Sequence, residues 1–95
     1  MMTPEELAAA VALVCGKDRR FEVSKVDYNA PPFRWKVTMW RKKRGTENND
    51  VPTWIPTGWS VHGYTRDRAM ETAERDALAW ADREAADPLT KWVFP

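Results

Sequence analysis

Residues 58–81, GWSVHGYTRDRAMETAERDALAWA, decide the fold of this chain. Before Gly63, apolar and polar residues alternate, which predicts a short strand over about 58–64. Thr65 is a residue type that caps helices. After it, apolar residues recur at helical spacing, which predicts an amphipathic helix over about 66–86. The expected apolar side of this helix is Ala69, Met70, Ala73, Ala77, Trp80 and Ala81.

The N-terminal segment predicts another helix, over about 4–15. Thr3 is suited to cap it, Pro4 suits the first helical position, and Glu6 completes a capping box. Gly16 is a natural terminator because glycine adopts the left-handed conformation at little cost. The expected core stripe of this helix is Leu7, Ala10, Val11 and Val14.

Two further strands are predicted between the helices. The first covers about 20–28 and ends at the turn 29–32, NAPP, because proline cannot donate to a sheet ladder. The second covers about 33–42, where apolar and polar residues alternate with a period of two. Its apolar side is Phe33, Trp35, Val37 and Met39.

The segment before the last strand is harder to assign. Residues 43–53 form a long connection that is rich in turn formers. Trp54 and Ile55 then lie between Pro52 and Pro56. Because proline interrupts a ladder, this stretch is expected to be an edge strand or a shaped loop rather than a central strand.

The predicted order is therefore α-β-β-β-α in a single domain over 1–95, with an apolar tail at 88–95 that can dock on the body. Three antiparallel strands expose one apolar face, and two helices are available to cover it. The sequence predicts an α+β fold, namely a two-layer sandwich with a three-stranded antiparallel sheet and both helices on one face.

Composition narrows the setting of this domain. No stretch approaches the roughly 20 apolar residues of a membrane helix, so no membrane association is expected. The start, MMTPEE, is acidic and lacks the charge and cleavage site of a signal peptide. Cys15 is the single cysteine, which fits a reducing compartment. We therefore expect a cytoplasmic protein.

The residue types needed for catalysis are scarce. His62 is the only histidine, and no cysteine or histidine spacing of a zinc site occurs. No glycine-rich phosphate loop and no nucleophile motif is present. We expect a protein that is not an enzyme and that holds no cofactor and no metal. His62 is expected to be an ordinary strand residue and Cys15 a small buried hydrophobe.

The predicted order resembles that of double-stranded RNA-binding domains, whose last helix also follows the third strand and packs alanines on the sheet. The closing segment is similar to that of HicB-type antitoxins, in the pattern Gly63, Thr65, Ala69, Ala73, Ala77 and Leu78. These resemblances imply the same fold. The HicB resemblance also implies a protein partner, because such antitoxins pair with a toxin.

The resemblance to RNA-binding domains is weakest where those domains hold RNA. Their last helix typically starts with a lysine cluster, whereas this chain has Arg66, Asp67 and Arg68, followed by Glu71 and Glu74. Their first hairpin typically presents a histidine, and this chain has NAPP there. The resemblance therefore favours the fold more than the family's way of binding RNA.

Charge is unevenly distributed, which suggests a first candidate surface. Residues 33–44 contain six basic residues and no acid, whereas 65–87 contain four arginines and seven acids. Basic side chains neutralise phosphates and exposed rings stack on bases. The alternative is a solvated strand face that resists aggregation, with Trp40 covered by the tail. The candidate residues are Arg34, Lys36, Trp40, Arg41, Lys42, Lys43 and Arg44.

Two other surfaces are candidates. Trp54 on its proline-framed segment, together with Trp59, is typical of an interface hot spot, although Trp54 could instead fold over the core. Leu78, expected to be exposed among acidic residues of the last helix, could contact a basic partner or a second copy, or be an ordinary exposed leucine. Arg66 and Arg68 complete the candidates.

The sequence thus predicts a small non-enzymatic binding protein. The leading hypothesis is an accessory or inhibitory factor, of phage or mobile-element type, that acts through protein–protein interaction. The alternative is a module that binds RNA or DNA with the basic outer face of the second strand.

Overall fold

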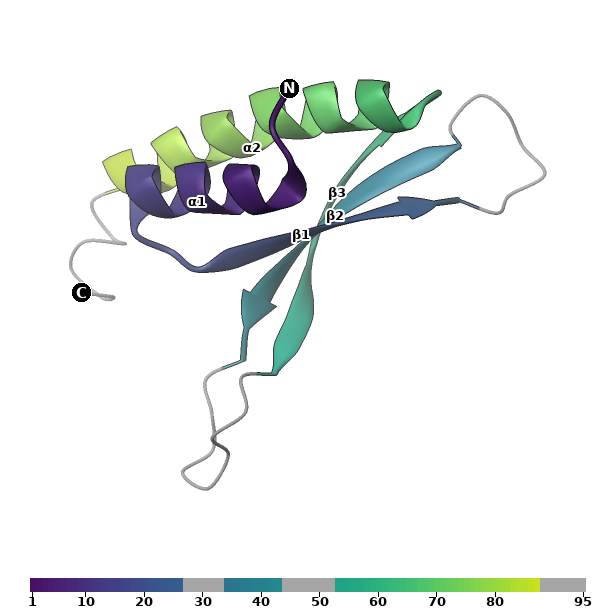
Figure 1. The fold of residues 1–95 in the computed structure, drawn as a ribbon. Coiled ribbons are helices and arrows are strands. Elements are labelled where there is room, and N and C mark those ends of the chain that lie inside the picture. The colour runs from purple at the N-terminus through teal and green to yellow at the C-terminus, as the bar shows by residue number, and fades with distance from the viewer. Residues whose placement is uncertain (27–33, 44–52, 88–95) are drawn as a thin grey trace.

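The computed structural model describes residues 1–26, 34–43 and 53–87. These form a three-stranded antiparallel sheet, ordered β1-β2-β3, with both helices on one of its faces (Figure 1). The elements in chain order are α1 (Pro4–Cys15), β1 (Arg19–Lys25), β2 (Trp35–Lys42), β3 (Trp54–Gly63) and α2 (Arg66–Ala86). The predicted α+β fold of order α-β-β-β-α is confirmed.

Helix α1 begins and ends as its sequence predicts. The Glu6 N–H donates to Thr3 Oγ1 over 3.1 Å, and the Thr3 N–H donates to Glu6 Oε1 over 3.0 Å, which closes the capping box. Gly16 adopts a φ of 72°, and its N–H donates to the Ala12 carbonyl over 2.8 Å. Both ends of the helix therefore satisfy backbone groups that would otherwise lack partners.

The core stripe of α1 differs from the prediction. Leu7 and Val11 are fully buried, but Ala10 is half-buried and Val14 is 39% exposed. Leu13, which the prediction did not mention, is 88% exposed. Since this helix is apolar on most of its sides, hydrophobic spacing could not tell which side faces the sheet.

The register of the sheet places one apolar row under the helices. Met39 of β2 lies opposite Phe21 of β1, and Val37 lies opposite Val23 on one side and Val61 on the other. β1 runs over 19–25 rather than 20–28, and the predicted turn at 29–32 lies outside the described residues, as does Phe33.

Strand β3 begins at Trp54, four residues before the predicted start. Of the two alternatives for 54–56, the structure shows the edge strand and not the shaped loop, and an edge position is where Pro56 can be tolerated. The register shifts in the middle of this strand: Thr57 Oγ1 donates to the Met39 carbonyl over 3.1 Å and accepts the Trp59 N–H over 3.2 Å. Gly58 adopts a φ of 87° within this bulge, so the glycine that suggested a strand boundary lies inside the strand.

Helix α2 is joined closely to β3. Thr65 Oγ1 accepts the Arg68 N–H over 3.1 Å and caps the helix. A Cβ atom on Gly63 would collide with the backbone of Ala69, so the glycine permits a close approach of strand and helix. The structure thereby explains the glycine-threonine-alanine pattern as packing.

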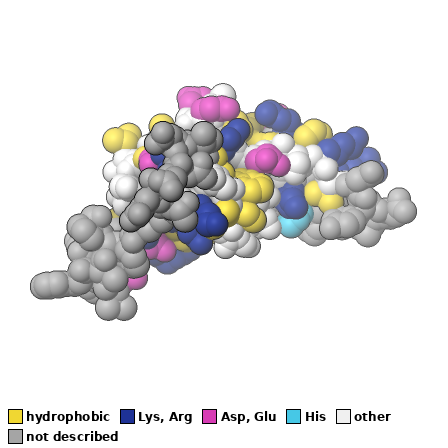
Figure 2. All heavy atoms as spheres, turned by 90° about the horizontal axis from the view of Figure 1, so that it is seen from below, with side chains coloured by type: hydrophobic (Ala, Val, Ile, Leu, Met, Phe, Trp, Pro, Cys, Tyr) yellow, Lys and Arg dark blue, Asp and Glu magenta, His cyan; other side chains and the backbone are white. Residues whose placement is uncertain are grey.

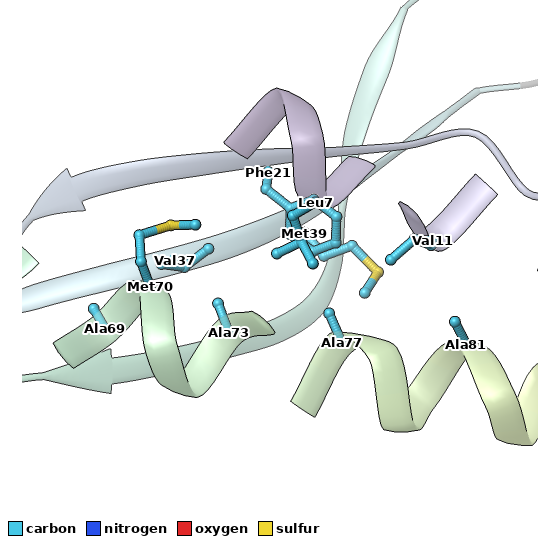
Figure 3. Packing of buried hydrophobic residues seen from close by; sticks show 10 residues of the cluster. All are labelled: Leu7, Val11, Phe21, Val37, Met39, Ala69, Met70, Ala73, Ala77 and Ala81. Atoms are coloured by element: carbon cyan, nitrogen blue, oxygen red, sulfur yellow. The ribbon is translucent and has the colours of Figure 1, made fainter. Parts of the chain in front are cut away.

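In the part of the chain that the structure describes, the buried apolar side chains form one cluster between the helices and the sheet (Figure 3). Trp80 is only half-buried at its margin, so the prediction that it belongs to the buried side of α2 is wrong in part. The buried members are Leu7, Val11, Phe21, Val37, Met39, Ala69, Met70, Ala73, Ala77 and Ala81.

The two helices lie side by side although they come from opposite ends of the chain. The Met2 N–H donates to Glu74 Oε2 over 3.4 Å, and Lys17 Nζ forms a 2.8 Å ion pair with Glu84. Among the described residues, neither helix is sufficiently long and apolar to span a membrane. The predicted docking of the tail, 88–95, and most of the connection 43–53 fall outside the described residues.

Candidate binding surface on the outer sheet face

The face of the sheet that points away from the helices is the outer face. Its residues follow from strand alternation, because their neighbours along each strand point into the core. Viewed from this side, Lys and Arg side chains are interspersed with hydrophobic ones (Figure 2). The residues of the outer face are Arg20, Glu22, Ser24, Lys36, Thr38, Trp40, Lys42, Trp54, Pro56, Ser60 and His62.

Trp40 lies at the middle of the outer face. It belongs to the central strand, with Arg20 opposite it on β1 and Pro56 opposite it on β3. Its side chain is half-buried, and its indole Nε1 is buried without a hydrogen-bond partner in the described part of the chain. A buried donor without an acceptor is uncommon in folded proteins. The Trp40 indole donor therefore has neither a hydrogen-bond partner nor contact with solvent among the described residues.

Trp54 is held beside Trp40 by a charged neighbour. Lys42, its partner in the ladder, places Nζ 5.7 Å from the centre of the Trp54 ring. The same Nζ lies 3.2 Å from Asp18 Oδ2, in an ion pair that is exposed to solvent. Trp54 is half-buried and does not fold over the core, which lies on the opposite face. Of the two alternatives drawn from the sequence, the structure favours the surface position.

The two tryptophans line a small pocket, here called the tryptophan pocket. Its volume is about 160 Å³, and its walls are Arg20, Glu22, Trp40 and Trp54. A shallow groove of about 580 Å³ shares three of these residues and continues along the free edge of β1 towards α1. This edge groove is lined by Pro4, Glu5, Ala8, Arg19, Arg20, Phe21, Glu22, Val23, Trp54 and Arg66.

The structure divides the predicted basic surface. Lys36 and Lys42 lie on the outer face with Trp40, and the exposed Arg34 and Lys43 flank the two ends of β2. Arg41 belongs to the opposite side of the strand, where it pairs with Arg19 and Ile55. Arg44 lies outside the described residues.

Trp59 does not share a surface with Trp54. It packs against the core from the inner face, with its ring centre 5.9 Å from that of Phe21 in an edge-to-face contact. The two tryptophans of the second candidate surface are therefore separated by the sheet. Residues 54 and 59 are separated by an odd number of positions, so alternation along one strand places them on opposite faces. This rule could not be applied from the sequence, because the predicted strand did not include Trp54.

Arg66 and Arg68 belong to the helix layer. Both are exposed at the start of α2; Arg66 lines the edge groove, and Arg68 lines a shallow depression beside Leu78. The prediction of an exposed Leu78 is wrong, because its side chain is half-buried against the core. The depression also contains Arg75, so the surroundings of Leu78 are not uniformly acidic.

Three residues of β1 went unrecognised in the sequence. Arg20 and Glu22 reach the tryptophan pocket through their register with β2. Arg19 lies on the other side of β1, with its guanidinium 5.3 Å from the centre of the Trp80 ring. Burial lowers the pKa of Arg19, although the charges of Cys15 and Glu84 oppose this shift.

Two other residues singled out in the sequence are placed as follows. His62 is exposed on the outer face opposite Lys36. Cys15 is half-buried, and its Sγ donates to the Val11 carbonyl over 3.2 Å. Across residues 1–26, 34–43 and 53–87, no three His, Cys, Asp or Glu side chains come together as a metal site would require.

No family model, curated protein or solved structure matches the chain.

Proposed function

We propose that this protein is a small non-enzymatic binding protein that engages another protein through the tryptophan pocket. The observation that carries the proposal is the pairing of Trp40 and Trp54 in one pocket, on the sheet face that the helices leave uncovered. An accessory or inhibitory factor of phage or mobile-element type, working in a reducing compartment such as the cytoplasm, would use such a surface.

The composition of the pocket favours a protein partner. Tryptophan and arginine are the residue types most enriched among hot spots, and hot spots favour pockets that exclude water on binding. Both rings stand on strands whose ladders fix their position, so little ordering entropy is lost on association.

The test compares partner capture by three versions of the protein. Wild type, Trp54→Ala and Leu13→Ala are immobilised and exposed to an extract of the source cells, and retained proteins are quantified by mass spectrometry. Leu13 is a control because it is an exposed apolar residue of α1, away from the sheet. We expect Trp54→Ala to lower retention of the specific partner at least tenfold and Leu13→Ala to leave it unchanged. Equal retention by all three would contradict the proposal.

A second function has one observation in its favour. Lys36 lies on the same face as Trp40, and the exposed Arg34 and Lys43 flank the two ends of β2, so positive charge lies near a ring that could stack on bases. Lys42 is already engaged by Asp18, and the arginines at the start of α2 flank an acid, Asp67. About four phosphate contacts would give a log–log salt slope of roughly −3 to −4.

Nucleic-acid binding is tested by filter binding to single- and double-stranded RNA and DNA at two salt concentrations. If this second function holds, the double variant Lys36→Gln/Lys43→Gln should weaken binding and flatten its salt dependence. The absence of binding to every probe at low salt would exclude it.

A further inference from the structure

We propose that the free edge of β1 binds an extended segment of the partner, which lies in the edge groove and joins the sheet as a fourth strand. On the outer face this segment carries an acidic side chain opposite Arg20 and a basic one opposite Glu22. The inference rests on the proposed function, because the edge groove shares Arg20, Glu22 and Trp54 with the tryptophan pocket.

The backbone groups of Phe21 and Val23 point to the free edge of β1. In an antiparallel pair, two opposite residues turn their N–H and C=O groups either towards each other or away from each other, and the two cases alternate along the strand. The Met39 carbonyl accepts the Thr57 hydroxyl of β3 over 3.1 Å, so the backbone of Met39 faces β3. Met39 lies opposite Phe21. Phe21, and Val23 two residues on, therefore offer their N–H and C=O groups to an added strand.

The two edges of the sheet differ in how well they resist an added strand. Natural proteins protect edge strands with prolines, bulges and charges. β3 contains Pro56 and the bulge at Gly58, which interrupt its free edge. β1 has seven residues in unbroken register with β2, and none of them is proline or glycine. β1 is therefore the edge on which strand addition can occur.

The groove beside this edge has room for the side chains of an added strand. Its volume of about 580 Å³ lies within the roughly 300–1,000 Å³ typical of binding sites. Pro4 and Ala8 of α1, together with Phe21 and Val23, give it an apolar wall on the inner face. Because side chains alternate along a strand, we expect apolar residues of the partner opposite Phe21 and Val23.

A second copy of the chain fits this edge poorly. α1 lies over β1 (Figure 1) and borders the edge groove. Antiparallel pairing of two β1 strands would bring the two α1 helices, on the same face, to the spacing of neighbouring strands, about 5 Å. Packed helices lie about 8–10 Å apart, so the two would collide. An extended segment brings no helix and avoids this collision.

The charges of the edge specify the outer side of the partner segment. Arg20 and Glu22 are exposed and lie on the outer face. Side chains that lie directly opposite each other on neighbouring strands interact, and opposite charges stabilise the pair whereas like charges destabilise it. An acid opposite Arg20 and a base opposite Glu22 therefore fix the register of the segment as well as its identity.

The test uses short peptides and the hydrogen exchange of the β1 amides. The probe is the peptide acetyl-Thr-Val-Lys-Val-Glu-Thr-amide, whose antiparallel alignment sets lysine opposite Glu22 and glutamate opposite Arg20. A control of the same composition exchanges the lysine and the glutamate. Two further controls carry N-methyl groups, one on both valines, whose N–H groups would bond to β1, and one on the lysine and the glutamate, whose N–H groups would point away from it.

In the free protein, we expect the amides of Arg20 and Glu22, which face β2, to exchange slowly and those of Phe21 and Val23 to exchange fast. The probe should slow exchange at Phe21 and Val23 at least tenfold. The charge-exchanged peptide should bind at least about fivefold more weakly. Methylation of the valines should abolish binding, and methylation of the lysine and glutamate should leave it unchanged.

A double variant tests the charges from the side of the protein. Arg20→Glu/Glu22→Arg should reverse the preference, so that it binds the charge-exchanged peptide more tightly than the probe. Leu13→Ala, on the exposed side of α1, should behave as wild type with every peptide. If the double variant fails to fold, as its thermal unfolding would show, the comparison of the two methylated peptides with the wild-type protein decides.

The proposal is overturned if the probe at millimolar concentration does not protect Phe21 and Val23, or if the peptide with methylated valines binds as tightly as the probe. Protection of these amides in the free protein would also overturn it: a rise with protein concentration would place a second copy at the edge, and no such rise would place another part of the chain there. Protection by a hexanucleotide of uridines, and not by the probe, would overturn it in favour of nucleic acid.

None of these results contradicts the proposed function while partner capture still depends on Trp54. Loss of that dependence would contradict the proposed function, and the peptide experiment is read independently of it.

Discussion

The unpaired indole N–H of Trp40 lowers the stability of the folded protein. A buried donor without a partner costs about 1–3 kcal/mol relative to a satisfied one, and the Trp40 indole is in that state among the described residues. We predict that Trp40→Phe leaves the free energy of unfolding unchanged or raises it by about 1 kcal/mol, as measured by urea denaturation. Trp59→Phe, which disturbs an edge-to-face contact in the core, is the control and should lower it. A clear loss of stability in Trp40→Phe would show that its donor is satisfied in solution.

Glu6 makes the stability of α1 depend on pH. Hydrogen bonds from the backbone and side chain of Thr3 lower the pKa of Glu6 from its ordinary value of 4.5. Because the folded pKa is the lower one, the capping box stabilises the protein above about pH 4.5 and is lost as the pH falls through the folded pKa.

Substitution of Glu6 tests this pH dependence. We predict that Glu6→Gln, which keeps the hydrogen bond and removes the charge, reduces the fall in melting temperature between pH 5 and pH 3. Glu5→Gln is the matched control, because Glu5 lies in the same turn but outside the capping box. An identical acid profile for wild type and Glu6→Gln would contradict the role of the ionised carboxylate.

At the scale of single elements, the two glycines of β3 allow steric collision and backbone strain to be measured separately. At Gly63 an added Cβ meets the backbone of Ala69, whereas at Gly58 it meets open space but requires a positive φ. We predict that Gly63→Ala costs well over 2 kcal/mol, because strand and helix must move apart. Gly58→Ala should cost about 1–2 kcal/mol, from backbone strain alone. Guanidinium denaturation of both variants measures the difference, and the reverse order would contradict the close approach.

The C-terminal half of α2 has a different kind of anchor. Trp80 is half-buried and lies under the Arg19 guanidinium rather than within the core. We predict that Trp80→Ala costs about 2 kcal/mol, which is less than the roughly 3–5 kcal/mol of a fully buried ring. Leu7→Ala, which removes a fully buried side chain, is the comparison and should cost about 2–5 kcal/mol. A larger loss in Trp80→Ala than in Leu7→Ala would place Trp80 in the core.

Local sequence signals predicted the helices better than the strands. Capping residues define the ends of α1 and α2 because they act on the nearest backbone groups. The start of β3 escaped prediction because its bulge depends on a contact with β2: the Thr57 hydroxyl replaces part of the ladder only when Met39 lies opposite it. Without knowledge of the opposite strand, Pro52, Pro56 and Gly58 look like the residues of a loop.

At the scale of the whole molecule, composition and order were sufficient for the fold class but not for the site. The sequence identified Trp40 and Trp54 as candidates, yet it grouped Trp54 with Trp59, which lies on the other face. It also missed Arg20 and Glu22, because their place in the pocket comes from the register between β1 and β2, which sets Arg20 opposite Trp40. A surface made from three strands depends on how the strands are registered against one another, and the hydrophobic periodicity of a single strand does not contain that information.

Because α1 packs beside α2, the core cannot be completed until the C-terminal helix is present. Half of the buried core within the described residues comes from α2, and Met2 and Lys17, which flank α1, reach α2 through hydrogen bonds that span 72 and 67 residues of sequence. Such non-local contacts slow folding, since a long loop must close before they form. A fragment that stops before α2 would lack one wall of the core and remain unfolded. Addition of a separate α2 peptide should restore secondary structure, at a rate that depends on the concentration of the peptide.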